Sequence, residues 1–244
     1  MAWTVPGLAL DIVLEPDNVQ REIGGKVRVH IYADNAIALI SMGVKVSFDA
    51  SVLQVIEASK FEDVPDGWLM DGDGDPLTTG DQYNNPAVEI DNTAGTVTMI
   101  GGHLVGDTNS ELSGKILLGW IVFEAKANGD SNINIDLGKY HPSHPTETFD
   151  NFVNTNGTVD EPTNLGDLGT ICVVENACEG DVNRDGVVNS GDSFKFKTVF
   201  PSSFGDGKYD PSCDLNGDGI VNPGDSFIFR SDFPRNDCPN CPTP

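Results

Sequence analysis

The feature that most constrains this chain is an internal repeat in its last third. Residues 181–201 read DVNRDGVVNSGDSFKFKTVFP, and residues 214–234 read DLNGDGIVNPGDSFIFRSDFP. The two segments start 33 residues apart and are identical at 13 of 21 positions. A match of this length at a fixed spacing indicates a duplicated supersecondary unit.

Each copy opens with a loop that has the ligand spacing of an EF-hand. Calcium takes six to eight oxygens, which such loops supply from positions 1, 3, 5, 7 and 12, with glycine at position 6. The first loop offers Asp181, Asn183, Asp185, the backbone carbonyl of Val187, and Asp192. The second loop offers Asp214, Asn216, Asp218, the backbone carbonyl of Ile220, and Asp225. We therefore expect two bound calcium ions.

A helix is predicted after each loop. Asp192 and Asp225 stand where an EF-hand has glutamate, and as acidic residues they favour the start of a helix. The helices carry phenylalanines four residues apart, which lie on one helix face, and each helix is followed by proline. The phenylalanine pairs are Phe196 with Phe200 and Phe229 with Phe233. We expect these aromatic pairs to form the core between the two copies.

The rest of the chain has the pattern of a β domain. Apolar residues alternate with polar ones in many short segments, for example at Val44, Val46 and Phe48, and turn residues separate the segments. The run at 116–123 is more continuously apolar and predicts a strand that is buried on both faces or one that crosses the sandwich. We expect a mainly β chain, with a jelly-roll β-sandwich over residues 1–176 and a small helical domain over residues 177–244.

These motifs carry two family resemblances. The C-terminal segment, with two loops of the form D-x-N-x-D-G-x-x-N-x-x-D that each precede a single helix, resembles a dockerin. The stretches Gly24 to Ser59 and Gly114 to Ile135 are similar to a cohesin, the β-sandwich partner of dockerins. The resemblance implies calcium-dependent, non-catalytic docking between proteins. Dockerins commonly carry a hydroxyl pair before position 12, where this chain has Ser190-Gly191 and Pro223-Gly224, so partner specificity does not carry over.

The net charge limits the kinds of partner that the chain can bind, and the cysteine content bears on its location. The chain has 14 basic and 38 acidic residues and a net charge of −24, which disfavours nucleic acids and anionic membranes and favours divalent cations. We expect no membrane insertion, because no apolar run is long enough. Clustered cysteines predict disulfides and an extracellular location, with any signal peptide absent from this numbering. The pairing is open among Cys172, Cys178, Cys213, Cys238 and Cys241.

One further acidic segment could hold a third calcium ion. Asp71, Asp73 and Asp75 alternate with glycine, but no strong closing ligand follows, and a solvated acidic turn is the alternative. We find no catalytic motif and expect no enzymatic activity.

Together these features predict an extracellular, calcium-dependent assembly protein. The dockerin-like module could bind its own sandwich, or it could bind the sandwich of another copy and build a head-to-tail filament or surface array. The alternative is a carbohydrate-binding sandwich with a dockerin-like tag.

Overall fold

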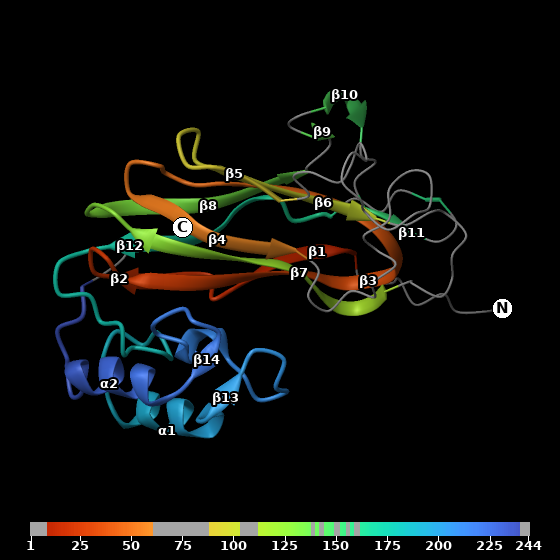
Figure 1. Cartoon of the computed structure of the whole chain (residues 1–244). Coiled ribbons are helices and arrows are strands. Elements are labelled where there is room, and N and C mark those ends of the chain that lie inside the picture. The colour runs from red at the N-terminus through yellow and green to blue at the C-terminus, as the bar shows by residue number, and fades with distance from the viewer. Residues whose placement is uncertain are drawn as a thin grey trace.

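The structure, a computed structural model, divides the chain into a β-sandwich and a small helical module packed beneath it (Figure 1). It describes residues 9–60, 88–102, 112–137, 140–141, 144–148, 152–154, 157–158 and 162–239. No helix within these ranges is both long and apolar enough to span a membrane.

One layer of the sandwich is built around the first half of a long strand, β3 (Lys26–Ser47). Its antiparallel neighbours are β1 (Asp11–Glu15) and β7 (Leu112–Ala125), and β7 also pairs with β4 (Leu53–Lys60). Its outer face carries a row of residues in register, Glu15, His30, Trp120 and Ser59.

The other layer contains the second half of β3. There the strand pairs with β6 (Thr96–Gly102) and with β8 (Gly129–Leu137). The sheet continues through β5 (Val88–Asp91) on one side and through β12 (Gly166–Val173) and β2 (Asn18–Arg21) on the other. The register shifts of β3 between Ile31 and Leu39, with positive φ at Asn35 and Ala38, mark where this strand passes from one layer to the other. Three short strands complete the domain, namely β9 (Tyr140–His141), β10 (His144–Thr148) and β11 (Val153–Asn154).

Alternating apolar residues of the two layers face each other and form the core. Alternation puts one side of each strand inside, since successive side chains point to opposite faces. Buried members include Ile12, Val29, Ile31, Val44, Val46, Phe123, Ile133, Ile135 and Ile171. The run 116–123 is buried along its whole length, as predicted. On the outer face, Trp120 is covered by the guanidinium of Arg28, which also bonds to the helical module.

The module contains the two predicted helices, α1 (Ser190–Val199) and α2 (Pro223–Asp232). The helices pack on each other through the rings of Phe196 and Phe229, which are stacked with centroids 5.4 Å apart. Val182, Val188, Leu215 and Val221 of the two loops are also buried in this core. The prediction that the repeated phenylalanines form the core is therefore correct for Phe196 and Phe229.

Short backbone ladders tie each loop to the other repeat. Val221 of β14 (Ile220–Val221) pairs with Ser202 of β13 (Ser202–Ser203), which follows the first helix. Val188 occupies the equivalent position in the first loop, and it pairs with Arg235, which follows the second helix. A short 3₁₀ helix, η2 (Pro211–Cys213), leads into the second loop. The repeats are thus related by an approximate two-fold axis, and neither is a unit without the other.

Disulfides hold the module at both ends. Cys178, at its start, is bonded to Cys238, at its end, with a sequence separation of 60 residues. Cys172 in β12 is also disulfide-bonded. The odd cysteine is Cys213, which is free and buried.

The expected fold class is confirmed. Over the described residues the chain is mainly β, with a β-sandwich followed by a small helical domain whose two loops each precede one helix.

Candidate calcium sites

The first loop gathers its acidic side chains around one point. Oxygens of Asp181, Asp185 and Asp192 all lie within 4.8 Å of one another. Backbone amides hold them there: Asp181 accepts from the amides of Asp185 (3.1 Å) and Gly186 (2.9 Å), and Asp185 accepts from that of Val187 (3.1 Å). The loop therefore presents a preformed cluster of hard oxygen ligands, which fits the chemistry of calcium.

Aspartate at position 12 reaches the cluster because it belongs to the first turn of the helix. Asn189 is the N-cap of α1, and Asp192 accepts from the Asn189 amide (2.9 Å) in a capping box. Its other oxygen accepts from the amide of Asn183 (3.0 Å), across the loop. The same carboxylate thus closes the loop and starts the helix, so folding of the loop and of the helix is coupled.

The second loop repeats this hydrogen-bond pattern. Asp214 accepts from the amides of Asp218 (3.1 Å) and Gly219 (2.8 Å), and Asp218 accepts from that of Ile220 (2.9 Å). Asp225 accepts from Leu215 (2.8 Å) and Asn222 (2.8 Å). The carbonyl of Ile220 accepts from the side chain of Asn222 (3.3 Å).

Burial makes the carboxylates of both loops unfavourable as bare anions. Desolvation raises the pKa of Asp181, and the neighbouring charge of Asp192 adds to this effect. Desolvation likewise raises the pKa of Asp214 and Asp225, with the charge of Asp218 adding to both. A divalent cation would offset both causes, since it replaces the lost hydration and neutralises the mutual repulsion.

The two loops differ in one contact that the repeat does not predict. Tyr209 donates its hydroxyl hydrogen bond to Oδ2 of Asp214 at 2.7 Å. The residue five positions before Asp181 in the first repeat is Asn176. The first residue of the second loop therefore has a phenol partner that its counterpart lacks.

The second loop also lies against the sandwich. The Arg28 guanidinium of β3 sits 3.9 Å from the centre of the Trp120 ring and donates to the carbonyl of Gly217 (3.3 Å). Gly217 has φ +70°, and a Cβ there would come within 3.3 Å of the Arg28 backbone nitrogen. Glycine is thus required both by the backbone conformation and by the close approach to β3.

Aromatic rings extend this contact. His30, fully buried, stacks on Tyr209 (centroids 5.7 Å apart) and meets the edge of Phe204 (5.0 Å). Burial, and secondarily the charge of Arg28, lower the pKa of His30 to about 4. His30 is therefore neutral in the folded protein at neutral pH.

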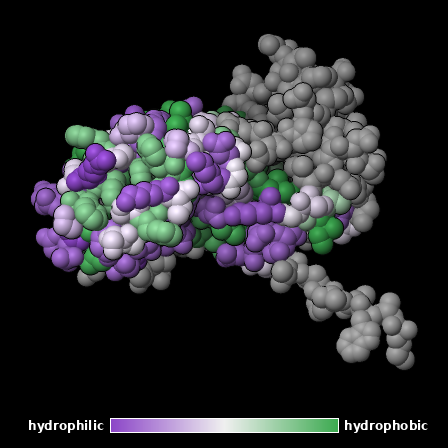
Figure 2. Space-filling model, turned by 90° about the horizontal axis from the view of Figure 1, so that it is seen from below, coloured by the Kyte–Doolittle hydropathy of each residue, from purple (hydrophilic) through white to green (hydrophobic). Residues whose placement is uncertain are grey.

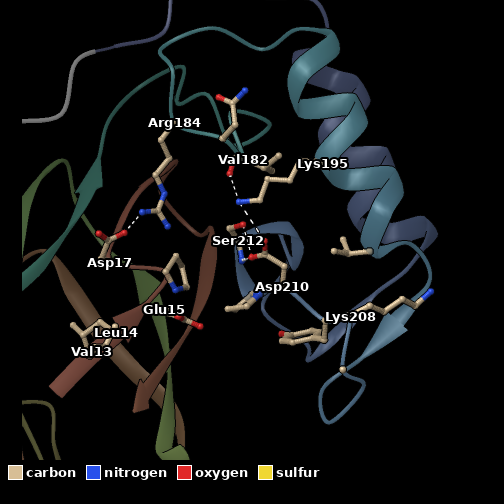
Figure 3. A pocket seen from close by; sticks show the side chains of 16 residues that line it. Val13, Leu14, Glu15, Asp17, Val182, Arg184, Lys195, Lys208, Asp210 and Ser212 are labelled. Carbon is tan, nitrogen blue, oxygen red and sulfur yellow. Dashed lines mark hydrogen bonds and ion pairs between the residues drawn. The ribbon is translucent and has the colours of Figure 1, made fainter. Parts of the chain in front are cut away.

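A polar cleft of about 690 Å³ continues between the module and the sandwich (Figure 3). Arg184 of the first loop forms an ion pair with Asp17 across it. Lys195 of α1 contacts Asp210 (3.2 Å) and donates to the carbonyl of Val182 (2.8 Å), both within the module. Two of the basic side chains that line this cleft are thus paired with acidic ones, and the pair of Arg184 with Asp17 joins the module to the sandwich.

The helix surface that faces away from the sandwich carries exposed aromatics. Phe194 and Phe227 occupy the same position of the two repeats, and their exposed fractions are 72% and 78%. Beside them, a groove of about 410 Å³ runs between the helices and is lined by Ser193, Phe196, Lys197, Phe200, Ser226, Phe229, Arg230 and Phe233. Figure 2 views the molecule from below, the side on which the helices lie, and shows green apolar patches there among purple polar side chains. We refer to this surface as the helix face.

Some predicted residues receive no test. Asp71, Asp73 and Asp75, the proposed ligands of a third calcium ion, lie outside the described residues. Trp120 is buried beneath Arg28, so it is not available as a surface for sugar stacking.

Comparison with known families agrees with this geometry. Residues 179–229 match the dockerin type I domain family. The C-terminal module is a dockerin type I domain. Dockerin domains bind calcium, and both they and cohesins are non-catalytic modules for association between proteins. Among curated proteins, none matches the chain significantly in sequence.

Three solved structures illustrate what the chain is similar to in fold. A type I cohesin–dockerin complex from Clostridium thermocellum is 13% identical, with a TM-score of 0.48, and the match covers 68% of this chain and 100% of that one. CaCohA2 from Clostridium acetobutylicum is 18% identical, with a TM-score of 0.46 and coverage of 70% and 94%. A non-cellulosomal cohesin from the archaeon Archaeoglobus fulgidus is 15% identical, with a TM-score of 0.42 and coverage of 69% and 93%.

Proposed function

We propose that the chain is an extracellular, calcium-dependent docking protein whose dockerin domain binds another protein through the helix face. The single observation that carries this proposal is the exposure of Phe194 and Phe227 at equivalent positions of the two repeats. A phenylalanine ring that stays in water does not gain the favourable free energy of burial. Exposed aromatic patches are typical of binding surfaces.

Two calcium ions would hold this surface in shape. The proposed ligands are Asp181, Asn183, Asp185, Val187 through its carbonyl, and Asp192 in the first loop, with Asp214, Asn216, Asp218, Ile220 through its carbonyl, and Asp225 in the second. Because the position-12 aspartate of the first loop also belongs to the capping box of α1, losing the ion there would unfold the start of that helix. The proposed domains are the sandwich, over residues 1–176, and the calcium-binding domain, over residues 177–244.

The partner that the surfaces favour is the sandwich of a second copy. The helix face carries exposed Lys197 and Arg230 beside its aromatic groove. On the layer that contains β8, β6 and β5, exposed Asp136 lies in register with exposed Lys45 of β3. Exposed Asp130 and Asp91 lie on the same strands, so acidic residues predominate there. Opposite charges on two free faces of one chain support head-to-tail contact, which does not close and therefore builds a filament.

The dockerin domain is already seated on its own sandwich through the opposite side of the module. The second calcium loop contacts β3 through Gly217, whereas Phe194 and Phe227 of the helix face are exposed. Seating within the chain and docking to another chain are therefore compatible. The disulfide between Cys178 and Cys238 favours an oxidising, extracellular compartment.

Sedimentation velocity of the full chain, over a range of concentrations and in millimolar calcium or chelator, tests this function. We expect species larger than the monomer in calcium and only monomer in chelator. The double variant Phe194→Ser with Phe227→Ser should stay monomeric in calcium, while Ile23→Ser, which removes an exposed apolar side chain of the sandwich, should assemble normally. A wild-type chain that stays monomeric at all concentrations in calcium would rule out self-assembly.

A further inference from the structure

The two calcium loops have similar sequences but different surroundings. Asp181 of the first loop is partly exposed, whereas its counterpart Asp214 in the second loop is 1% exposed. Asp185 and its counterpart Asp218 are both exposed. Gly217 and Gly219 of the second loop are buried as well. The cause is the sandwich, which covers the second loop and leaves the first largely in solvent.

The sandwich presents buried positive charge to the second loop. Arg21 of β2 and Arg28 of β3 are only 3% and 8% exposed. A guanidinium stays charged even when buried, and a buried charge is stable only with a counter-charge or good hydrogen bonds. Arg21 donates to the carbonyls of Lys26 (2.6 Å) and Gln20 (2.7 Å), and the negative charges acting on it come from Glu179, Asp214 and Asp225.

Arg28 approaches the loop even more closely. Besides its hydrogen bond to Gly217, a Cβ built on Gly219 would lie 3.4 Å from its guanidinium carbon. Arg28 thus contacts the backbone of the second loop, and Arg21 interacts electrostatically with its carboxylates Asp214 and Asp225. The Tyr209 hydroxyl satisfies one oxygen of Asp214 in addition.

The first loop has no such compensation within its own sequence. Its one basic residue, Arg184, occupies the position of Gly217 and is paired with Asp17 of the sandwich. Its three clustered carboxylates therefore face one another, and repulsion between them is relieved only by a bound cation or by protons.

We propose that the sandwich supplies the counter-charge of the second loop, so that the two calcium sites are not equivalent. The first loop is the calcium-regulated site. The second loop binds calcium more weakly, because Arg21 and Arg28 repel the ion, and it stays folded and seated on the sandwich when calcium is removed. This inference rests on the proposed calcium binding by both loops.

Hydrogen exchange of the full wild-type chain, followed by mass spectrometry with and without chelator, tests the difference directly. We expect peptides from residues 181–199 to lose protection when calcium is removed. Peptides from residues 214–221, and from the facing part of β3 at residues 26–33, should keep theirs. Equal loss of protection in both loops would overturn the proposal.

A charge variant tests its electrostatic cause. Calcium titration of Arg28→Gln should show the weaker site tightened about tenfold, with the stronger site unchanged, because a buried repulsive charge has been removed. Exchange at residues 214–221 should become dependent on calcium in the same variant. Lys45→Gln changes the charge equally on the far layer of the sandwich and should leave both affinities as in wild type.

The remaining outcomes separate this proposal from the calcium sites themselves. Weaker binding at the second loop of Arg28→Gln, or two sites of equal affinity in wild type, would overturn the inference but leave calcium binding intact. Failure of the wild-type chain to bind any calcium would overturn the proposed function as well. Because the exchange experiment uses wild type, a variant that fails to fold does not remove the test.

Discussion

The ring of Phe196 stacks on the ring of Phe229 at 5.4 Å, and this contact joins the two halves of the dockerin domain. Both residues are nearly buried, at 5% and 6% exposure, although the domain is small. Few aliphatic side chains support them, so much of the apolar stabilisation of this domain depends on this pair.

Phe196→Ala should therefore destabilise the domain by about 3–5 kcal/mol, the range for removing a buried phenylalanine. Urea unfolding in excess calcium, monitored by far-UV circular dichroism, measures the change. Phe194→Ala is the matched control, because Phe194 lies two residues away in the same helix but is exposed. Its free energy of unfolding should stay within about 0.5 kcal/mol of wild type. Similar losses in both variants would mean that the stacked pair is not the core.

The disulfide between Cys178 and Cys238 should contribute about 4 kcal/mol, because it closes a loop of 60 residues in the unfolded chain. The double variant Cys178→Ser with Cys238→Ser should lose about that amount in thermal or urea unfolding. The loss should be seen in calcium as well as in chelator, since the effect acts on the unfolded state. An unchanged midpoint would show that the bond does not constrain the domain.

Cys213 should be unreactive in the folded protein. Burial raises the pKa of its thiol to about 12, and the reactive species is the thiolate. With a colourless aromatic disulfide reagent that releases a coloured thiol, we expect no reaction at pH 8 in calcium and one thiol per chain after denaturation. Rapid reaction of the native protein would contradict the buried position of Cys213.

His30 should make the folded protein sensitive to acid. Its pKa is lowered to about 4, whereas the unfolded chain has the ordinary value near 6.5. Between these values the unfolded chain takes up a proton and the folded chain does not, so stability falls as the pH decreases from 6.5 to 4. The loss should be about 2 kcal/mol between pH 7 and pH 4.5.

His30→Gln isolates this effect from the carboxylates. Its free energy of unfolding should decrease less than that of wild type over the same pH range, by about 2 kcal/mol, when both are measured in excess calcium. Parallel pH profiles for the two proteins would exclude His30 as the source.

Local sequence predicted the local features of this molecule well. The loop spacing from Asp181 to Asp192 predicts a clustered set of carboxylates, because EF-hand geometry is encoded within twelve residues. The alternation at Val44 and Val46 predicts buried strand positions, because side-chain direction in a strand repeats every two residues. The resemblance to a dockerin is likewise carried by residues that are close in sequence.

Long-range contacts were not predictable in the same way. The hydrogen bond between Arg28 and Gly217 joins residues that are 189 positions apart in the sequence. No sequence motif around either residue indicates the other as its partner. Phe194 and Phe196 are residues of the same type in the same helix. Which of them is buried therefore depends on how α1 packs on α2. Five cysteines form ten possible pairs, and only the folded chain selects the pairing of Cys178 with Cys238.

Isothermal titration calorimetry of the full chain with calcium, beginning from chelator-treated protein, tests the central claim most directly. We predict a stoichiometry of two calcium ions per wild-type chain, and of one ion per chain for Asp181→Ala and for Asp214→Ala. Asp206→Ala, which replaces an exposed aspartate of the same domain outside both loops, should retain two. A stoichiometry that is unchanged in Asp181→Ala and Asp214→Ala would contradict the assignment of these loops as the calcium sites that hold the docking surface together.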